Sequence, residues 1–255
     1  MQLYTKFCDE TLDEHGVLQD FSLHYPENYN FGYDVVDEMA RLAPEQRAMA
    51  WCNPEGERRE FTFGDISRLS NQAANVLRAH GVSKGDKVLV ILKRNYEYWY
   101  VAPALHKLGA VIIPATHMLT VDDLVYRIRT AHITAAVATP DGTTVADLLE
   151  ARKLCPELET IFAVRKQQPG TVDFTAEKPV KHTFTGYSVP SEMILLTSPG
   201  MEQLTIDVMP RNVRDAAKAM RGGVRILAER PGERPAPDRG RDGLGQGLLG
   251  KDLRT

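Results

Sequence analysis

Residues 87–116 of this 255-residue chain read KVLVILKRNYEYWYVAPALHKLGAVIIPAT. The run Lys87–Leu92 is apolar after its first residue and predicts a strand that is buried on both faces. The run Tyr96–Leu108 predicts a helix, and Ala110–Ile113 predicts a second buried strand, which Pro114 ends. A strand, a helix and a strand in this order are typical of parallel α/β structure.

The same alternation extends in both directions from this stretch. Thr62 and Asp65 have the spacing of a capping box and predict the start of a long helix. We therefore predict an α/β fold with a mostly parallel sheet covered by helices on both faces. The expected helices are 34–42, 62–81, 121–131 and 144–153, and the expected further strands are 47–52, 57–61, 135–138, 160–164 and 193–196. Residues 1–33 are expected to be an irregular arm, and residues 165–190 a polar connector.

The composition of the chain changes near Tyr187. All 2 Trp, 9 Tyr and 8 Phe residues lie at or before this position, although aromatic side chains supply much of the buried area of a core. Residues 229–247 are mainly Arg, Gly, Pro and Asp, a composition that cannot offset the entropy of ordering. We predict an incomplete domain at 1–196 and a disordered, non-homologous tail at 197–255, in which 215–220 could form a short helix.

Overall composition excludes several classes of protein. The net charge of −3 and the pI near 6.2 give no basic footprint for nucleic acid. Cys8, Cys52 and Cys155 are too widely spaced to predict a disulfide framework or a zinc site, and a reducing cytoplasmic location is expected. The charged N-terminus argues against a signal peptide, and no apolar run is long enough to predict a membrane span.

A glycine-rich stretch near the C-terminus matches two phosphate-binding patterns. Gly245–Gly250 fits G-x-G-x-x-G, and Gly245–Lys251 fits G-x-x-x-x-G-K. Both patterns need a preceding strand and a following helix, and neither is expected here. Asp252 also replaces the hydroxyl residue that a P-loop uses to reach magnesium. We interpret both matches as chance, which disfavours a stand-alone nucleotide-binding oxidoreductase.

Residues within the central stretch have ordinary structural interpretations. His106 and His117 have no carboxylate or second His at ligand spacing, so structural roles are predicted. Lys107 is predicted to be a solvated helix residue. Four aromatic residues are predicted to pack in the core rather than form a substrate cage: Tyr96, Tyr98, Trp99 and Tyr100.

Several motifs together resemble a known family. They are Phe61–Phe63 (FTF), Gly81–Val88 (GVSKGDKV), Lys93–Trp99 (KRNYEYW), His106–Thr116 (HKLGAVIIPAT) and Leu119–Thr120. This set resembles the N-terminal domain of adenylate-forming, AMP-binding acyl-CoA synthetases, in the branch of acetyl- and medium-chain acyl-CoA ligases. The resemblance covers roughly residues 20–165 and, more weakly, 191–196.

The resemblance implies a reaction and a set of small-molecule partners. Such ligases of fatty acid metabolism activate a carboxylic acid with ATP and Mg²⁺, release pyrophosphate, and transfer the acyl group to coenzyme A. The resemblance also implies a phosphate loop of the form YFTSGTTGxPK directly after a strand like Met193–Leu196. The sequence continues instead as TSPGMEQL, where only Thr197, Ser198 and Gly200 match as cofactor-binding remnants. We therefore expect no catalytic residue, no tight binding of ATP or coenzyme A, and no adenylation by this chain alone.

The tail suggests a reading-frame hypothesis. Residues 227–255 can be encoded so that the frame starting at the second nucleotide reads WQNVRENGLHLTVAGTGWGKASWGKIYG. That string resembles a stretch that this ligase branch carries after its phosphate loop. We hypothesise that the frame slips near Leu196, through gene decay or sequencing error. The alternative is a non-enzymatic half-protein or binding module that self-associates or pairs with a separately encoded C-terminal half.

Overall fold

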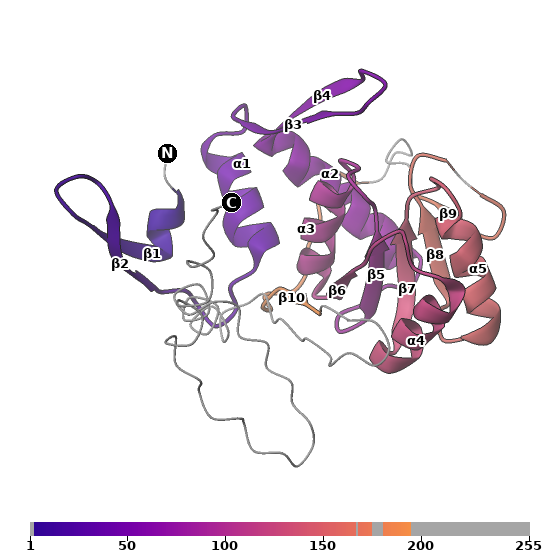
Figure 1. Cartoon of the computed structure of the whole chain (residues 1–255). Coiled ribbons are helices and arrows are strands. Elements are labelled where there is room, and N and C mark those ends of the chain that lie inside the picture. The colour runs from indigo at the N-terminus through magenta and orange to yellow at the C-terminus, as the bar shows by residue number, and fades with distance from the viewer. Residues whose placement is uncertain (1–2, 167, 175–180, 195–255) are drawn as a thin grey trace, which may run out of the picture.

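A parallel sheet organises the fold in the computed structural model, which describes residues 3–166, 168–174 and 181–194 (Figure 1). Its strands are β5 (Lys87–Ile91), β6 (Val111–Pro114), β7 (Ile133–Ala138), β8 (Thr160–Ala163), β9 (Val172–Asp173) and β10 (Glu192–Met193). The helices that flank it are α2 (Phe63–Ala79), α3 (Tyr98–Leu108), α4 (Val121–Ala131) and α5 (Thr144–Leu154). The spatial order is β10-β6-β5-β7-β8-β9, and every neighbouring pair is parallel. The predicted α/β class is confirmed.

Alternate side chains of the central strand face opposite sides of this sheet. Val88 and Val90 belong to an apolar cluster with residues of α2 and α3. Leu89 and Ile91 belong to a second cluster, with residues of α4 and α5. All four side chains are buried, which explains why the strand is apolar throughout rather than alternating.

Local signals in the sequence set several boundaries. The Thr62 hydroxyl accepts a hydrogen bond from Asp65 N, and the Asp65 carboxylate accepts one from Thr62 N, so the predicted capping box opens α2. Gly109 ends α3 with φ of 68°. A Cβ at Gly109 would lie 2.8 Å from Val189 Cγ2, so glycine suits both the left-handed turn and the close approach there.

The expectation of an irregular arm at residues 1–33 is wrong. This region forms a short 3₁₀ turn, η1 (Leu3–Lys6), and an antiparallel hairpin of β1 (Cys8–Leu12) and β2 (Leu18–Leu23). A π-helix, η2 (Phe31–Asp37), then leads into α1 (Glu38–Leu42). A second hairpin pairs β3 (Arg47–Cys52) with β4 (Arg58–Thr62). Both hairpins project away from the main sheet (Figure 1), and the strands of the first were missed because neither has a buried residue.

The connector after β8 is more structured than predicted. It contains β9 at one edge of the sheet, and residues 181–191 then lead to β10 at the other edge. The predicted short helix at 215–220 and the predicted disorder of 229–247 lie outside the described residues. Within the described ranges, no helix combines the length and apolar character needed to cross a bilayer.

Candidate functional site at the carboxyl edge of the sheet

The order of the strands marks one position on the sheet as a candidate ligand site. After β5 the chain passes to α3 on one face, whereas after β7 it passes to α5 on the opposite face. The loops that follow these adjacent strands therefore diverge. In open α/β sheets, ligands bind outside the carboxyl ends of the strands at such a switch point. The carboxyl ends of β5 and β7 are therefore the candidate site.

A small polar network joins the two strand ends at this position. Asn95 Nδ2 donates to Thr139 Oγ1 at 3.1 Å, and Thr139 Oγ1 donates to Asp141 Oδ2 at 2.8 Å. Asn95 and Thr139 are buried, so their polar atoms depend on these bonds. The network fixes the loops after β5 and β7 relative to each other, and it was not predicted from the sequence.

Positively charged residues follow two of the strands at the same edge. Lys93 and Arg94 come after β5, and Arg165 and Lys166 come after β8; all four are exposed. Lys93 and Arg165 also have left-handed backbones, with φ of 51° and 63°. Such conformations are costly for non-glycine residues and concentrate at functional sites. The positive charge suits an anionic ligand such as a phosphate.

The residues predicted to bind the nucleotide follow the last described strand in the sequence. Thr197, Ser198 and Gly200 lie outside the described residues, as do Gly245–Lys251 of the glycine-rich patterns. The strand that precedes them is present, because β10 pairs in parallel with β6 and Ile194 N donates to Ile112 O at 2.9 Å. β10 therefore runs toward the same carboxyl edge as β5 and β7.

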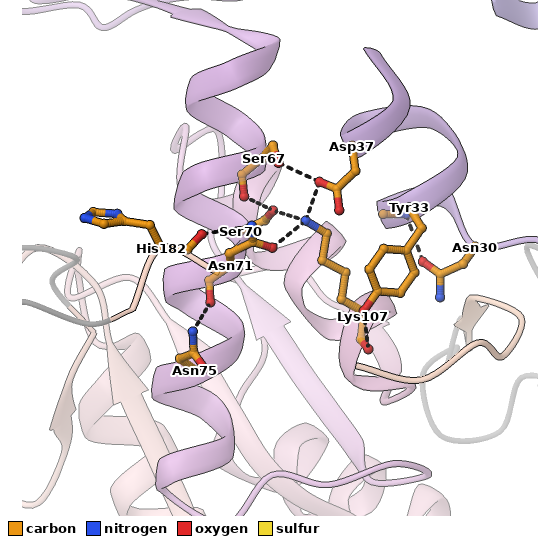
Figure 2. A network of polar contacts seen from close by, with 10 residues as sticks. Asn30, Tyr33, Asp37, Ser67, Ser70, Asn71, Asn75, Lys107 and His182 are labelled. Carbon is orange, nitrogen blue, oxygen red and sulfur yellow. Dashed lines mark hydrogen bonds and ion pairs between the residues drawn. The ribbon is translucent and has the colours of Figure 1, made fainter. Parts of the chain in front are cut away.

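The prediction that Lys107 is a solvated helix residue is wrong. Its side chain has 0% exposure, and Nζ donates to Asp37 Oδ1 at 2.6 Å, Ser70 Oγ at 2.9 Å and Asn71 Oδ1 at 2.8 Å (Figure 2). Burial lowers the pKa of Lys107, and the Asp37 carboxylate opposes that shift. The apolar composition of the helix could have indicated this position, because every residue from Tyr100 to Leu108 is buried and a helix that is apolar on all sides is buried as a whole.

The other predictions for α3 have mixed outcomes. His106 is buried, as a structural role requires, and burial lowers its pKa to about 4. Neither ring nitrogen of His106 has a hydrogen-bond partner within the described part of the chain. Tyr100 packs in the core as predicted, but Trp99 is 56% exposed and does not. His117 is exposed, and among the described residues no cluster of three or more His, Cys, Asp or Glu side chains could hold a metal ion.

Comparison with known families identifies the family of this chain. Residues 36–207 match the family described as AMP-binding enzyme. The chain belongs to this family. The matched range includes the three predicted nucleotide-binding remnants at 197, 198 and 200, and it covers strands β5 to β10 of the parallel sheet described above.

Full-length relatives of this AMP-binding chain are acyl-coenzyme A synthetases. Human mitochondrial acyl-coenzyme A synthetase ACSM4 is 33% identical over 173 residues, which is 65% of this chain and 29% of that protein. Human mitochondrial ACSM3 is 37% identical over 142 residues, or 52% of this chain and 24% of that protein. The chain therefore spans less than a third of the length of these relatives.

Solved structures support the same fold. An acyl-CoA synthetase from Brucella canis superposes with a TM-score of 0.63 at 19% identity, over 76% of this chain and 35% of that one. The anthranilate CoA ligase AuaEII, solved in complex with anthranoyl-AMP, gives 0.60 at 21% identity, over 72% and 35% of the two chains. At these identities the likeness is one of fold.

Proposed function

We propose that this chain supplies the N-terminal part of an AMP-forming acid–CoA ligase. In this reaction a carboxylate attacks the α-phosphorus of ATP and pyrophosphate leaves; the thiol of coenzyme A then attacks the acyl carbon and AMP leaves. One observation carries the proposal. β10 lies parallel to β6 and runs toward the switch-point edge, so the remnants Thr197, Ser198 and Gly200 follow a strand with the direction that a phosphate loop needs.

The described residues suit one part of this chemistry. Lys93, Arg94 and Lys166 would attract the phosphates of ATP or coenzyme A by their charge, whereas the charge of Arg165 is paired with Glu97. Magnesium has no carboxylate cluster within the described ranges, so it would arrive bound to the phosphates of ATP or with ligands from elsewhere. Carboxylic acid and coenzyme A are the small-molecule partners of the proposal.

We further propose that the 255-residue chain does not form an adenylate alone. The run TTGxPK and its Lys are missing after Ser198, and Glu202 adds a negative charge to the sequence that replaces the phosphate loop. A phosphoryl-transfer site needs backbone N–H groups and a cation to stabilise departing pyrophosphate. Without them, ATP, Mg²⁺ and coenzyme A are expected to bind weakly.

A pyrophosphate-exchange assay tests these proposals. The purified chain is incubated with Mg-ATP, labelled pyrophosphate and several carboxylic acids, and a full-length acyl-coenzyme A synthetase serves as the positive control. We expect no exchange above background; clear turnover would refute the inactivity of the chain. A chimera in which residues 197–255 are replaced by the corresponding and following part of a full-length relative is expected to exchange pyrophosphate. A folded chimera without exchange would count against a ligase N-terminal part.

A half-protein that pairs with a separately encoded remainder is the second candidate. It is favoured by β10, which pairs only with β6 within the described residues and so presents an edge to a further strand. Co-expression of the chain with the C-terminal part of a relative, followed by size-exclusion chromatography, tests this pairing. A stable complex supports it, and separate elution contradicts it.

Two proposals on origin and location are tested at the gene and in the cell. Resequencing the locus decides whether the frame slips near Leu196; an intact frame with no ligase-like sequence in the adjacent frame would remove that hypothesis. We propose a cytoplasmic location, although the matched human relatives are named mitochondrial. Cell fractionation with antibodies against the chain tests this location. Recovery of the protein in the organelle fraction would contradict it.

A further inference from the structure

Residues 181–191, here called the strap, lead to β10, and side chains of α2 hold the first part of the strap, residues 181–185. Asn75 Nδ2 donates to Lys181 O at 2.9 Å and Thr183 O at 3.0 Å. Asn71 Nδ2 donates to His182 O at 3.1 Å, and Arg78 donates to Thr185 O at 3.2 Å. The first part of the strap is therefore held by donors from α2 side chains.

Lys107 determines which way the amide of Asn71 points. The Lys107 ammonium carries only donors, and it donates to Asn71 Oδ1 at 2.8 Å. The oxygen of Asn71 must therefore face the lysine, which turns Nδ2 toward His182 O in the strap (Figure 2). Asp37 and Ser70 occupy the other donors of the ammonium, so the orientation is fixed.

The backbone carbonyl of Lys107 makes a further contact with the strap, in addition to the one through Asn71. Tyr187 N donates to Lys107 O at 3.1 Å, and Tyr33 OH donates to the same oxygen at 3.4 Å. Gly186 approaches so closely that an added Cβ would lie 1.9 Å from Lys107 O. Lys107 thus contacts the strap through its carbonyl oxygen. Through its ammonium it also orients Asn71, which bonds to the strap.

The strap leads directly into β10. Asn30 Nδ2 donates to Val189 O at 2.9 Å, and Ser191 N donates to Tyr29 O at 3.3 Å. β10 itself has only two residues, Glu192 and Met193. So short a strand has few ladder bonds with which to hold its own register on β6, and the contacts of the strap supply the remainder.

We propose that Lys107 and Asn71 are positioning residues that set the register of β10 through the strap. Resting on the proposed function, they thereby fix the strand that precedes the predicted remnants in the sequence. A buried lysine with an acidic partner would serve packing alone equally well. The distinguishing feature is the relay through Asn71, which reaches the strap without contributing to the apolar core.

Asn71→Asp separates the relay from simple stabilisation. The carboxylate still accepts from Lys107 Nζ, but it cannot donate to His182 O and would repel it. Asn71→Leu loses both contacts, and Lys107→Met loses the ammonium. Asn53→Asp makes the same chemical change in an exposed turn, where Asn53 Oδ1 accepts from Glu57 N, and serves as the matched control.

Hydrogen–deuterium exchange with mass spectrometry on the full 255-residue chain provides the measurement. In Asn71→Asp we expect amide exchange in peptides from 181–194 to accelerate on the order of tenfold. Peptides from 121–154 and the urea midpoint should stay at wild-type values, as in Asn53→Asp. Wild-type exchange in 181–194, or equal acceleration in 121–154, would overturn the proposal. The assay needs no catalysis, so its outcome is independent of whether the proposed ligase function holds.

Discussion

Arg165 and Glu97 form a two-point ion pair between the segment after β8 and the start of α3. Arg165 Nε donates to Glu97 Oε1 at 2.5 Å, and Nη2 donates to Oε2 at 3.1 Å. The Glu97 side chain is 3% exposed and that of Arg165 is 33% exposed. The guanidinium also lies 4.7 Å from the ring centroid of Tyr96 and 5.1 Å from that of Trp51. This contact links the candidate edge of the sheet to the β3–β4 hairpin.

Removing either partner of this pair should have unequal effects. Arg165→Met leaves the nearly buried Glu97 carboxylate without its counter-charge, and we expect a loss of about 2–4 kcal/mol in the free energy of unfolding. Glu97→Gln leaves a neutral amide and an arginine that can reach solvent, so a loss of about 1 kcal/mol is expected. Urea unfolding of both variants checks the order. Equal losses in the two variants would show that the burial of Glu97 does not determine the change in the free energy of unfolding.

His106 should make the protein sensitive to acid. Its pKa is about 4 when folded because burial disfavours the charged ring, against about 6.5 in an unfolded chain. Below pH 6.5 the unfolded state takes up the proton first, so stability falls as pH drops toward 4, by up to about 1.4 kcal/mol per pH unit. The contribution is complete above pH 6.5.

Urea midpoints between pH 4 and 7.5 test the role of His106. His106→Leu is expected to flatten the pH dependence in this window without destabilising the protein at pH 7.5, because both ring nitrogens lack partners among the described residues. His117→Leu removes an exposed imidazole and is the control. If the urea midpoint of His106→Leu fell with decreasing pH as steeply as that of the wild type, His106 would not be the group responsible for the acid sensitivity.

Gly186→Ala should destabilise the strap severely. The added methyl would lie 1.9 Å from Lys107 O and 2.4 Å from Tyr33 OH, so backbone must move. We expect the free energy of unfolding to fall by about 2–4 kcal/mol. Gly64→Ala is the comparison, because its Cβ would lie 3.2 Å from Pro44 O at the start of α2. Thermal unfolding of the two variants measures the difference, and a near-neutral Gly186→Ala would show that the strap adjusts freely.

The helix caps offer a matched test of local stability. Thr120→Ala removes the hydroxyl that accepts from Asp123 N at the start of α4, and a loss of about 1 kcal/mol is expected. Thr143 also precedes a helix but makes no side-chain cap bond, so Thr143→Ala should change stability little. Chemical denaturation compares them, and similar losses in both variants would contradict a role for the cap geometry.

The resemblance and the periodicity of the sequence anticipated much of the sheet. The predicted strands 87–92 and 110–113 are confirmed as β5 (Lys87–Ile91) and β6 (Val111–Pro114), because continuous apolar runs can be buried on both faces; Pro114, expected to end the second strand, is its last residue. Residues 1–33 were misjudged because an exposed hairpin has no apolar face to detect. The network of Asn95, Thr139 and Asp141 was missed for another reason, since its members are up to 46 positions apart and only the strand order brings them together.

The sequence by itself determined the α/β class, the family and the capped start of α2, because these depend on local patterns and on motifs of adjacent residues. Tertiary structure alone decided the environment of Lys107 and His106. Neighbours in sequence, both are buried, yet one is fully paired and the other has unpaired ring nitrogens within the described part of the chain. The physical reason is that burial and hydrogen bonding depend on which distant segments pack against a side chain, and no local pattern specifies those segments.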